Sequence, residues 1–198
     1  MAEQRGDGRD RILAATLSML ARRTSGGISV SEVSTRASVS RSTVYHHFGD
    51  KVGLLQAVGL HVADIFKDAL LAAVRAQPDP QVRLEVVIDA LAAVGHRHPE
   101  ALQLLAREPA FGMDLLRTVF AEFVTLVDRL LVPAVRDSDT DRFAGISSAE
   151  LAELVVRIVM SAYLIPASIP EVGDVRSAVS AELFLVSRSR GPVVPAIG

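Results

Sequence analysis

The 198-residue sequence contains no cysteine. This absence excludes disulfide scaffolds, thiol catalysis and zinc sites built on cysteine, and it is typical of a cytoplasmic protein. No apolar run approaches the roughly 20 residues that a bilayer-spanning helix needs, since the longest one, near residues 154–160, contains Arg157. The first ten residues carry charges of both signs in place of an apolar secretion signal. We therefore expect a protein that is neither exported nor inserted in a membrane.

The apolar content is nevertheless high, with 49% hydrophobic residues and a mean hydropathy of +0.33. Because no membrane span accounts for it, a buried interface between subunits is the simplest explanation. Charge is spread unevenly along the chain. Residues 1–51 hold eight basic and five acidic side chains, a net charge of +3, whereas residues 52–198 hold 13 and 18, a net charge of −5. This asymmetry indicates a small basic module joined to a larger acidic one, unless it is chance clustering of solvated charge.

Apolar residues recur with helical periodicity almost throughout, beginning with Ile12, Leu13, Leu17 and Leu20. Ser29 and Ser147, each followed three residues later by glutamate, predict helix starts with capping boxes. After the first stripe the pattern predicts helices from Ser29, over 40–48 and 51–77, and at 81–96, 99–107, 113–135, 148–165 and 171–188. No stretch alternates with a period of two. The prediction is an all-α fold, with an N-terminal three-helix unit continued into a larger helical bundle.

Two short helices joined by a turn at residues 37–40 have the spacing of a helix-turn-helix motif. The small Ala37 fits the point where the helices cross, and Val39 can fill the core beneath the turn. Arg41, Ser42 and Thr43 then occupy the first turn of the second helix, where contacts with the major groove usually originate.

The segment that follows resembles the tetracycline-repressor (TetR) family of transcriptional regulators. The resemblance covers residues 9–58 and is strongest in a threonine, apolar, tyrosine, any, histidine, phenylalanine pattern with a lysine three positions on. That pattern is filled by Thr43, Val44, Tyr45, His46, His47, Phe48 and Lys51. Ser38 stands where the family usually has glycine. The resemblance implies a helix-turn-helix DNA-binding domain at residues 1–50 and a ligand-binding and dimerisation domain at residues 51–198.

The family's DNA contacts map onto residues of this motif. Arg41 would donate two hydrogen bonds to guanine and the Thr43 methyl would contact thymine, with Ser42 beside them. Phosphate or groove contacts would come from Ser29, Ser31, Tyr45, His46, His47 and Lys51. The alternative for each of these residues is an ordinary solvated polar side chain.

The resemblance further implies a homodimer and a small-molecule effector of unknown identity. The apolar helices at 148–165 and 171–188 would form a four-helix interface between subunits. We expect a largely hydrophobic effector. Bulky or adaptable side chains that could line its pocket, or be ordinary core, are Phe66, His96, Phe111, Met113, Phe120, Phe123, Met160 and Tyr163.

Catalysis and metal binding are not expected. His96 and His98 lack helical metal-ligand spacing, with only Glu100 close by, and no catalytic or cofactor-binding motif is present. We therefore predict no cofactor, no metal and no enzymatic activity, although an all-helical enzyme with an unfamiliar site stays open. The main alternative is a binding module that has lost DNA recognition. Retention of Arg41, Tyr45 and Lys51 favours the predicted DNA-binding regulator, and within that prediction a repressor.

Overall fold

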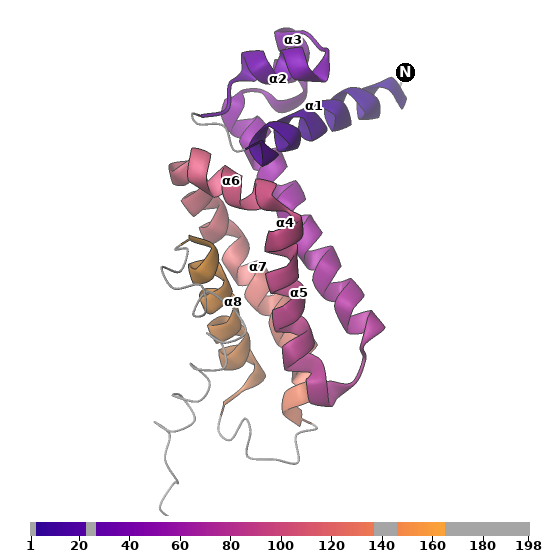
Figure 1. Cartoon of the computed structure of the whole chain (residues 1–198), viewed down its shortest axis with the longest axis vertical. Helices are drawn as coiled ribbons and strands as arrows, with labels where there is room; N and C mark the ends of the chain where they lie inside the picture. Colours follow the sequence, from indigo (N-terminus) through magenta and orange to yellow (C-terminus); the bar gives the residue numbers. More distant parts are fainter. Residues whose placement is uncertain (1–2, 23–26, 137–145, 165–198) are drawn as a thin grey trace, which may run out of the picture. The chain divides into compact units, whose positions relative to one another are not determined.

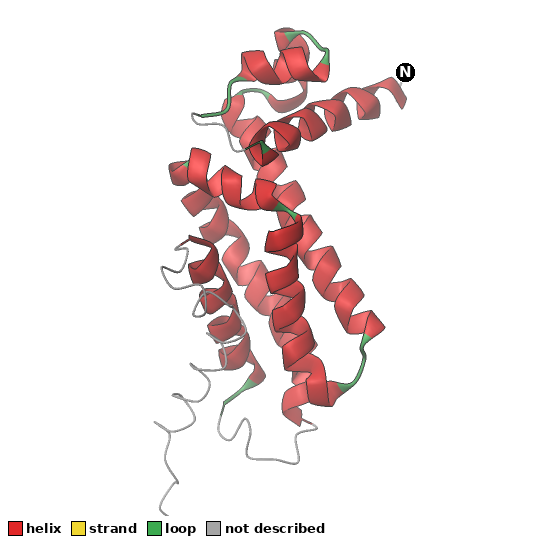
Figure 2. Ribbon diagram, viewed as in Figure 1, coloured by secondary structure: helices red, strands yellow, loops and turns green. Residues whose placement is uncertain are grey.

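The computed structural model describes residues 3–22, 27–136 and 146–164, and within these ranges all regular structure is helical (Figures 1 and 2). The helices are α1 Glu3–Ala21, α2 Val30–Ala37, α3 Arg41–Phe48, α4 Lys51–Ala76, the short 3₁₀ helix η1 Pro80–Val82, α5 Arg83–Arg97, α6 Pro99–Arg107, α7 Pro109–Arg136 and α8 Ser148–Leu164. The predicted all-α fold is confirmed. The predicted helix at 171–188 lies outside the described residues. None of the described helices is both long and apolar enough to span a bilayer.

Most helix boundaries follow from proline and from capping residues. Pro99 and Pro109 each occupy the first position of a helix, where proline's missing N–H is not needed. The predicted start of α7 at residue 113 is four residues too late, because Pro109 begins the helix and does not break it.

The two predicted capping boxes have different outcomes. At α8, the Ser147 N–H donates to Glu150 Oε2 over 2.9 Å and the Glu150 N–H donates to Ser147 Oγ over 3.2 Å, so this box is confirmed. At α2, Ser29 occupies the N-cap position but its side chain makes no capping hydrogen bond. The helix start was predicted correctly there and the capping box was wrong.

The chain divides into two compact units. The first contains Met1–Phe66 and Val94–Val119, and the second contains Lys67–Ala93 and the chain from Phe120 onward. The core of the first unit contains Leu13, Ile28, Val33 and Val44, and the partly buried Leu17, Val39 and Phe48 pack against it. It also contains Leu104 of α6, which is 1% exposed. The unit that surrounds the motif is therefore larger than the three N-terminal helices.

Polar contacts also connect the helices of the second unit. The buried Arg83 guanidinium donates to the carbonyls of Pro78 and Leu130, and the Tyr163 hydroxyl donates to the carbonyl of Leu91. On α8, the buried residues are Leu151, Ala152, Val155, Val156 and Val159. Leu154 and Ile158 are half-buried. The apolar circumference of α8 is thus used largely within the chain itself.

One residue of the helix-turn-helix has a strained backbone. Ser38 caps α2 in the left-handed conformation, with φ 53° and ψ 47°, and its carbonyl accepts a hydrogen bond from Arg11. A side chain at such a position costs about 1–2 kcal/mol, whereas glycine adopts it readily. The family's usual glycine therefore has a physical reason at this position.

Replacing Ser38 with glycine is expected to raise the free energy of unfolding by about 0.5–1 kcal/mol, because relief of the strain exceeds glycine's entropic cost. Chemical denaturation of both proteins measures the change. Ser38→Ala is the matched control, since it keeps the Cβ and should gain no stability. Equal stability of the glycine and alanine variants would show that the strain is absent.

Candidate nucleic-acid interface

The first turn of α3 presents the residues predicted to contact bases. Ser40 caps the helix, with its Oγ accepting the Thr43 N–H over 3.0 Å. The same Oγ lies 2.7 Å from Ser42 Oγ and 2.8 Å from Thr43 Oγ1. Arg41 and Ser42 are exposed, and Thr43 is half-buried. The cap therefore fixes the start of α3 and orients two of its hydroxyl groups.

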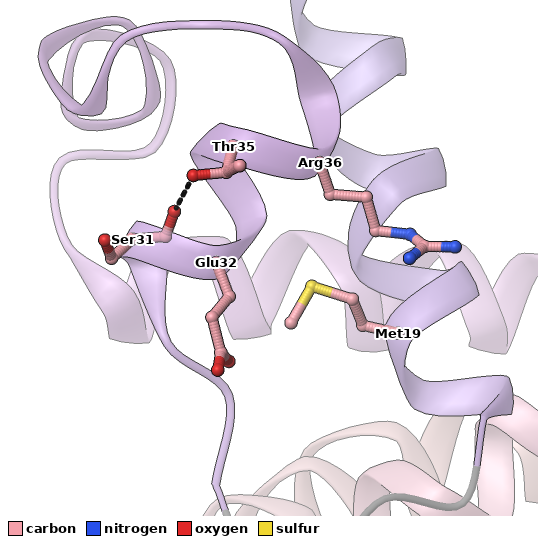
Figure 3. A pocket seen from close by; sticks show the side chains of 5 residues that line it. All are labelled: Met19, Ser31, Glu32, Thr35 and Arg36. Atoms are coloured by element: carbon pink, nitrogen blue, oxygen red, sulfur yellow. Dashed lines mark hydrogen bonds between the residues drawn. The ribbon is translucent and has the colours of Figure 1, made fainter.

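The Arg41 side chain reaches back to the preceding helix. Its Nη2 donates to Oγ of Ser31 on α2. Two of the predicted contact residues, Arg41 and Ser31, are thus held together across the motif. The carbonyl of Ser31 also accepts hydrogen bonds from the hydroxyls of Ser34 and Thr35, as Figure 3 shows for Thr35. Ser29, at the N-cap of α2, is half-buried.

The second half of α3 carries both exposed and packed side chains. Tyr45 is 49% exposed and His46 is also exposed, as phosphate contacts require. His47 is half-buried, and its ring lies against Gly8 of α1. A side chain at Gly8 would place its Cβ only 3.2 Å from His47 Nε2. The His47 ring therefore belongs to the packing between α1 and α3, and its predicted DNA contact stays a prediction.

Lys51 has an acidic partner that the sequence pattern does not predict. Its Nζ lies 2.7 Å from Oε1 of Glu108, the residue between α6 and α7, and the same oxygen accepts the Ile28 N–H over 2.8 Å. Lys51 keeps 41% of its side chain exposed, and Glu108 keeps 16%. Burial alone would raise the pKa of the Glu108 carboxyl, but Lys51, the Ile28 N–H and the charge of Arg107 together outweigh it and hold that pKa below its usual value.

Two arginines of α1 were also missed as supports of the interface. Arg11 Nη2 donates to the carbonyl of Ala37 over 2.6 Å, and so holds the turn between α2 and α3. The Arg9 guanidinium lies 5.7 Å from the centre of the Phe48 ring. The available signal was basic residues on the polar face of the first helix, but that pattern also fits solvated charge.

A surface hollow of about 420 Å³ lies beside α2 (Figure 3). It is lined by Met19, Ser31, Glu32, Thr35 and Arg36. Arg36 Nη2 donates to Ser18 Oγ over 2.8 Å, so α1 and α2 are joined by a polar contact here. None of the eight predicted effector contacts lines this hollow.

The predicted effector-binding residues are divided between the two units. In the first unit, Phe111 packs against the core around the helix-turn-helix and Met113 is 39% exposed; Phe66 is half-buried. His96 lies on α5, and its side chain is outside the described set.

In the second unit, Phe123 is buried, whereas Phe120, Met160 and Tyr163 are half-buried. The Phe120 ring lies 5.1 Å from the Arg157 guanidinium carbon. The pocket assignment stays a prediction for all eight residues. His98 pairs with Glu100 over 2.8 Å, and among the described residues no group of three or more metal-ligating side chains is found.

Comparison with known proteins finds a family match in the N-terminal part of the chain. Residues 12–58 match the profile described as "Bacterial regulatory proteins, tetR family". The HTH-type transcriptional regulator BetI of Burkholderia cenocepacia strain HI2424 is 36% identical over 83 residues, which are 41% of this chain and 43% of that protein. BetI of Paraburkholderia phytofirmans strain PsJN is 35% identical over a match of the same length. The matched part thus spans less than half of these relatives.

Solved structures share the fold over nearly the whole chain. PfmR, a TetR-family transcriptional regulator from Thermus thermophilus, superposes with a TM-score of 0.60 at 17% identity, over 90% of this chain and 97% of that one. The TetR-family repressor AlkX from Dietzia sp. strain DQ12-45-1b gives 0.52 at 24% identity, over 91% and 94%. A γ-butyrolactone receptor gives 0.54 at 19% identity, over 92% and 99%. The chain therefore has a helix-turn-helix followed by further helices, as far as residues 27–136 and 146–164 are described. Its residues 12–58 are similar to the TetR family of bacterial regulatory proteins.

Proposed function

We propose that the chain is a ligand-responsive DNA-binding transcriptional regulator, a repressor that a small hydrophobic effector releases from a palindromic operator. The observation that supports it most directly is the outer face of α3. Arg41, Ser42 and Tyr45 stay exposed there, while Val44 of the same helix is 0% exposed in the core. A helix held by its inner face with donors on its outer face suits the major groove.

The proposal assigns DNA reading to residues 1–50, and effector binding and dimerisation to residues 51–198. It places the protein in the cytoplasm and gives it no enzymatic activity. A repressor and a γ-butyrolactone receptor share the fold, which suits regulation by a small apolar molecule. Such an effector must prefer the conformation that does not fit the operator, because equal affinity for both conformations shifts nothing.

The proposed homodimer uses residues 148–165 and 171–188. Within the described part of this segment, Val155 is 0% exposed in the single chain, so α8 would meet a partner through its other side. That side carries the half-buried Leu154 and Ile158 beside the ion pair of Arg157 Nη2 with Glu153 Oε1 at 2.6 Å. An apolar strip bordered by charge is a common composition for a subunit interface.

The test is selection from a pool of random duplexes at low salt. We expect enrichment of an inverted repeat whose half-sites lie about one helical turn, ~34–36 Å, or a multiple of it apart, because each subunit of a two-fold dimer reads one half-site. Light scattering of the complex should give two chains per duplex. Enrichment of no sequence would favour a binding module that has lost DNA recognition, and a single unrepeated half-site would contradict the dimer. The selected duplex then serves to screen apolar compounds for release.

A further inference from the structure

The contact between Glu108 and Lys51 joins two distant parts of the first unit. Glu108 follows α6, whereas Lys51 is the first residue of α4 and lies three residues after the end of α3. One carboxylate oxygen, Oε1, meets both Lys51 Nζ and the Ile28 N–H, which precedes α2. Glu108 therefore contacts the segment before α2 and the start of α4, but it belongs to neither helix of the helix-turn-helix, α2 or α3.

The site that holds Lys51 suits an anion. The start of a helix carries a partial positive charge, and a lysine there adds a full one, so a carboxylate and a DNA phosphate are both favourable partners. An ammonium paired with a carboxylate is already neutralised and displaces fewer counterions from DNA. From this geometry we infer that Glu108 competes with the DNA backbone for Lys51, and so lowers the protein's affinity for every duplex. The inference rests on the proposed DNA-binding function.

The carboxylate is held in place by its surroundings. Arg107 Nη1 donates to the carbonyl of Met19 on α1 over 3.0 Å, which fixes the junction between α6 and α7 against α1. A Cβ on Gly27 would lie 3.0 Å from Glu108 Oε1 and 3.7 Å from Lys51 Nζ, so the backbone passes close over the ion pair. Because Glu108 cannot easily turn away, Lys51 must leave it to reach a phosphate.

A purely structural role for Glu108 predicts the opposite sign of effect. If Glu108 only stabilises the first unit, its loss destabilises the helix-turn-helix and weakens DNA binding. If it competes for Lys51, neutralising it strengthens DNA binding. Glu108→Gln separates these possibilities, because the amide oxygen still accepts the Ile28 N–H while the charge is gone.

The experiment measures the affinity of the full chain for the selected operator and for an unrelated duplex of equal length, across a salt series. For each subunit bound, Glu108→Gln should tighten binding to both duplexes about 3- to 10-fold at ~0.1 M salt, the size of one further phosphate contact. The slope of log affinity against log salt should become steeper by up to about 0.9 per subunit. In a Lys51→Met background, Glu108→Gln should no longer raise the affinity, so the double variant should bind no more tightly than Lys51→Met alone. Thermal unfolding of each variant checks that it is folded.

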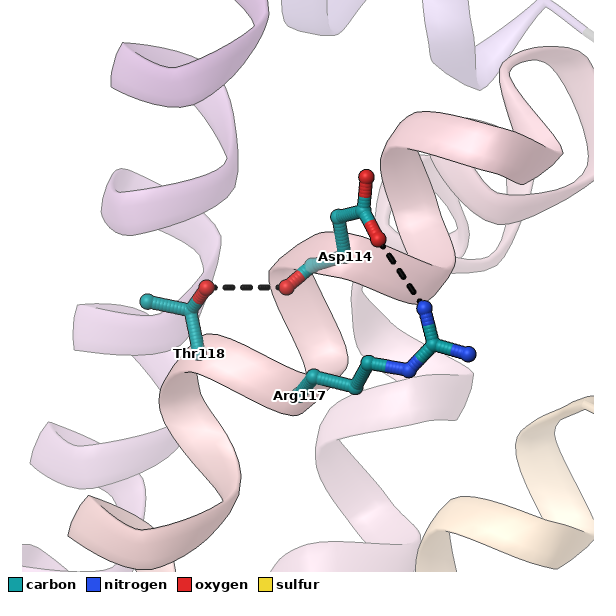
Figure 4. A network of polar contacts seen from close by, with 3 residues as sticks. All are labelled: Asp114, Arg117 and Thr118. Atoms are coloured by element: carbon teal, nitrogen blue, oxygen red, sulfur yellow. Dashed lines mark hydrogen bonds and ion pairs between the residues drawn. The ribbon is translucent and has the colours of Figure 1, made fainter.

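Asp114→Asn is the matched control (Figure 4). Asp114 is also in the first unit and pairs with Arg117 over 3.0 Å, but 77% and 72% of these two side chains are exposed and neither partner is Lys51. Its removal changes the net charge equally, so DNA affinity should move less than about twofold for this solvent-screened pair.

Three results would overturn the inference. They are an unchanged or lower affinity of Glu108→Gln, a gain that persists with Lys51→Met, and an equal gain from Asp114→Asn. Failure of the proposed function has a different signature, since the unmodified chain would then bind no duplex even at low salt. In that case the competition has no second partner and the inference falls with the function.

Discussion

Replacing Arg41 with alanine is expected to weaken binding at each half-site of the operator by about 1–3 kcal/mol, roughly 5- to 150-fold, and to relax base preference at one position. The physical reason is that Arg41 is exposed at the first position of α3, and its planar guanidinium can donate two hydrogen bonds to guanine. In the free protein Nη2 donates to Ser31 Oγ, so the side chain is already extended along the motif. Fluorescence anisotropy on the operator and on its single-base-pair variants measures both effects.

Arg36→Ala is the control for this prediction. Arg36 is also an exposed arginine of the helix-turn-helix, and its Nη2 likewise donates to a serine hydroxyl, that of Ser18. Its removal costs the same charge but should affect all duplexes alike and leave base preference unchanged. If Arg41→Ala weakened every single-base variant equally, Arg41 would be a phosphate contact and base reading would lie elsewhere on α3.

Local patterns were enough to predict most of the helices and the turn of the helix-turn-helix. Val33 and Val44 lie in the core of the first unit because the helical period dictates which side chains share an inward face. Val39, predicted to fill the core beneath the turn, packs against that core. The capping boxes mark the limit of such rules. Ser147 and Ser29 have the same spacing to a glutamate, yet only Ser147 forms the box. Side-chain rotamers at a helix start also depend on neighbours that the pattern does not contain.

Contacts between distant segments could not be predicted in the same way. Glu108 is 80 residues from Ile28 in the chain, and its pairing with Lys51 exists only because α6 packs beside α1. Because the sequence does not reveal this packing, it predicted only a phosphate contact for Lys51. The effector pocket had a similar limit, since bulky apolar side chains on helices predict burial but do not distinguish a packed core from a cavity wall. Measurements on individual rings can make that distinction.

Phe123→Ala is expected to lower the free energy of unfolding of the second unit by about 3–5 kcal/mol, the usual cost of deleting a core phenylalanine. Phe123 is 7% exposed on α7, within a unit whose buried residues include Val127 and Leu131 of the same helix. The cost combines lost burial with the cavity that remains where the ring was. Denaturant unfolding followed by circular dichroism measures the change. Phe123 would then be packed core in the free protein, and not the open wall of an effector pocket.

Phe120→Ala is the matched comparison, because Phe120 lies one turn earlier on the same helix and carries the same ring. It is half-buried and lies 5.1 Å from the Arg157 guanidinium carbon, an interaction that is itself worth about 0.5–1 kcal/mol at an exposed site. Its loss should cost clearly less than the loss of Phe123. Equal small costs at both positions would contradict the prediction, since a ring that borders an empty cavity has few contacts to lose. That result would support Phe123 as an effector contact. An apolar compound that fills the space should then stabilise the unmodified chain more than the Phe123→Ala variant.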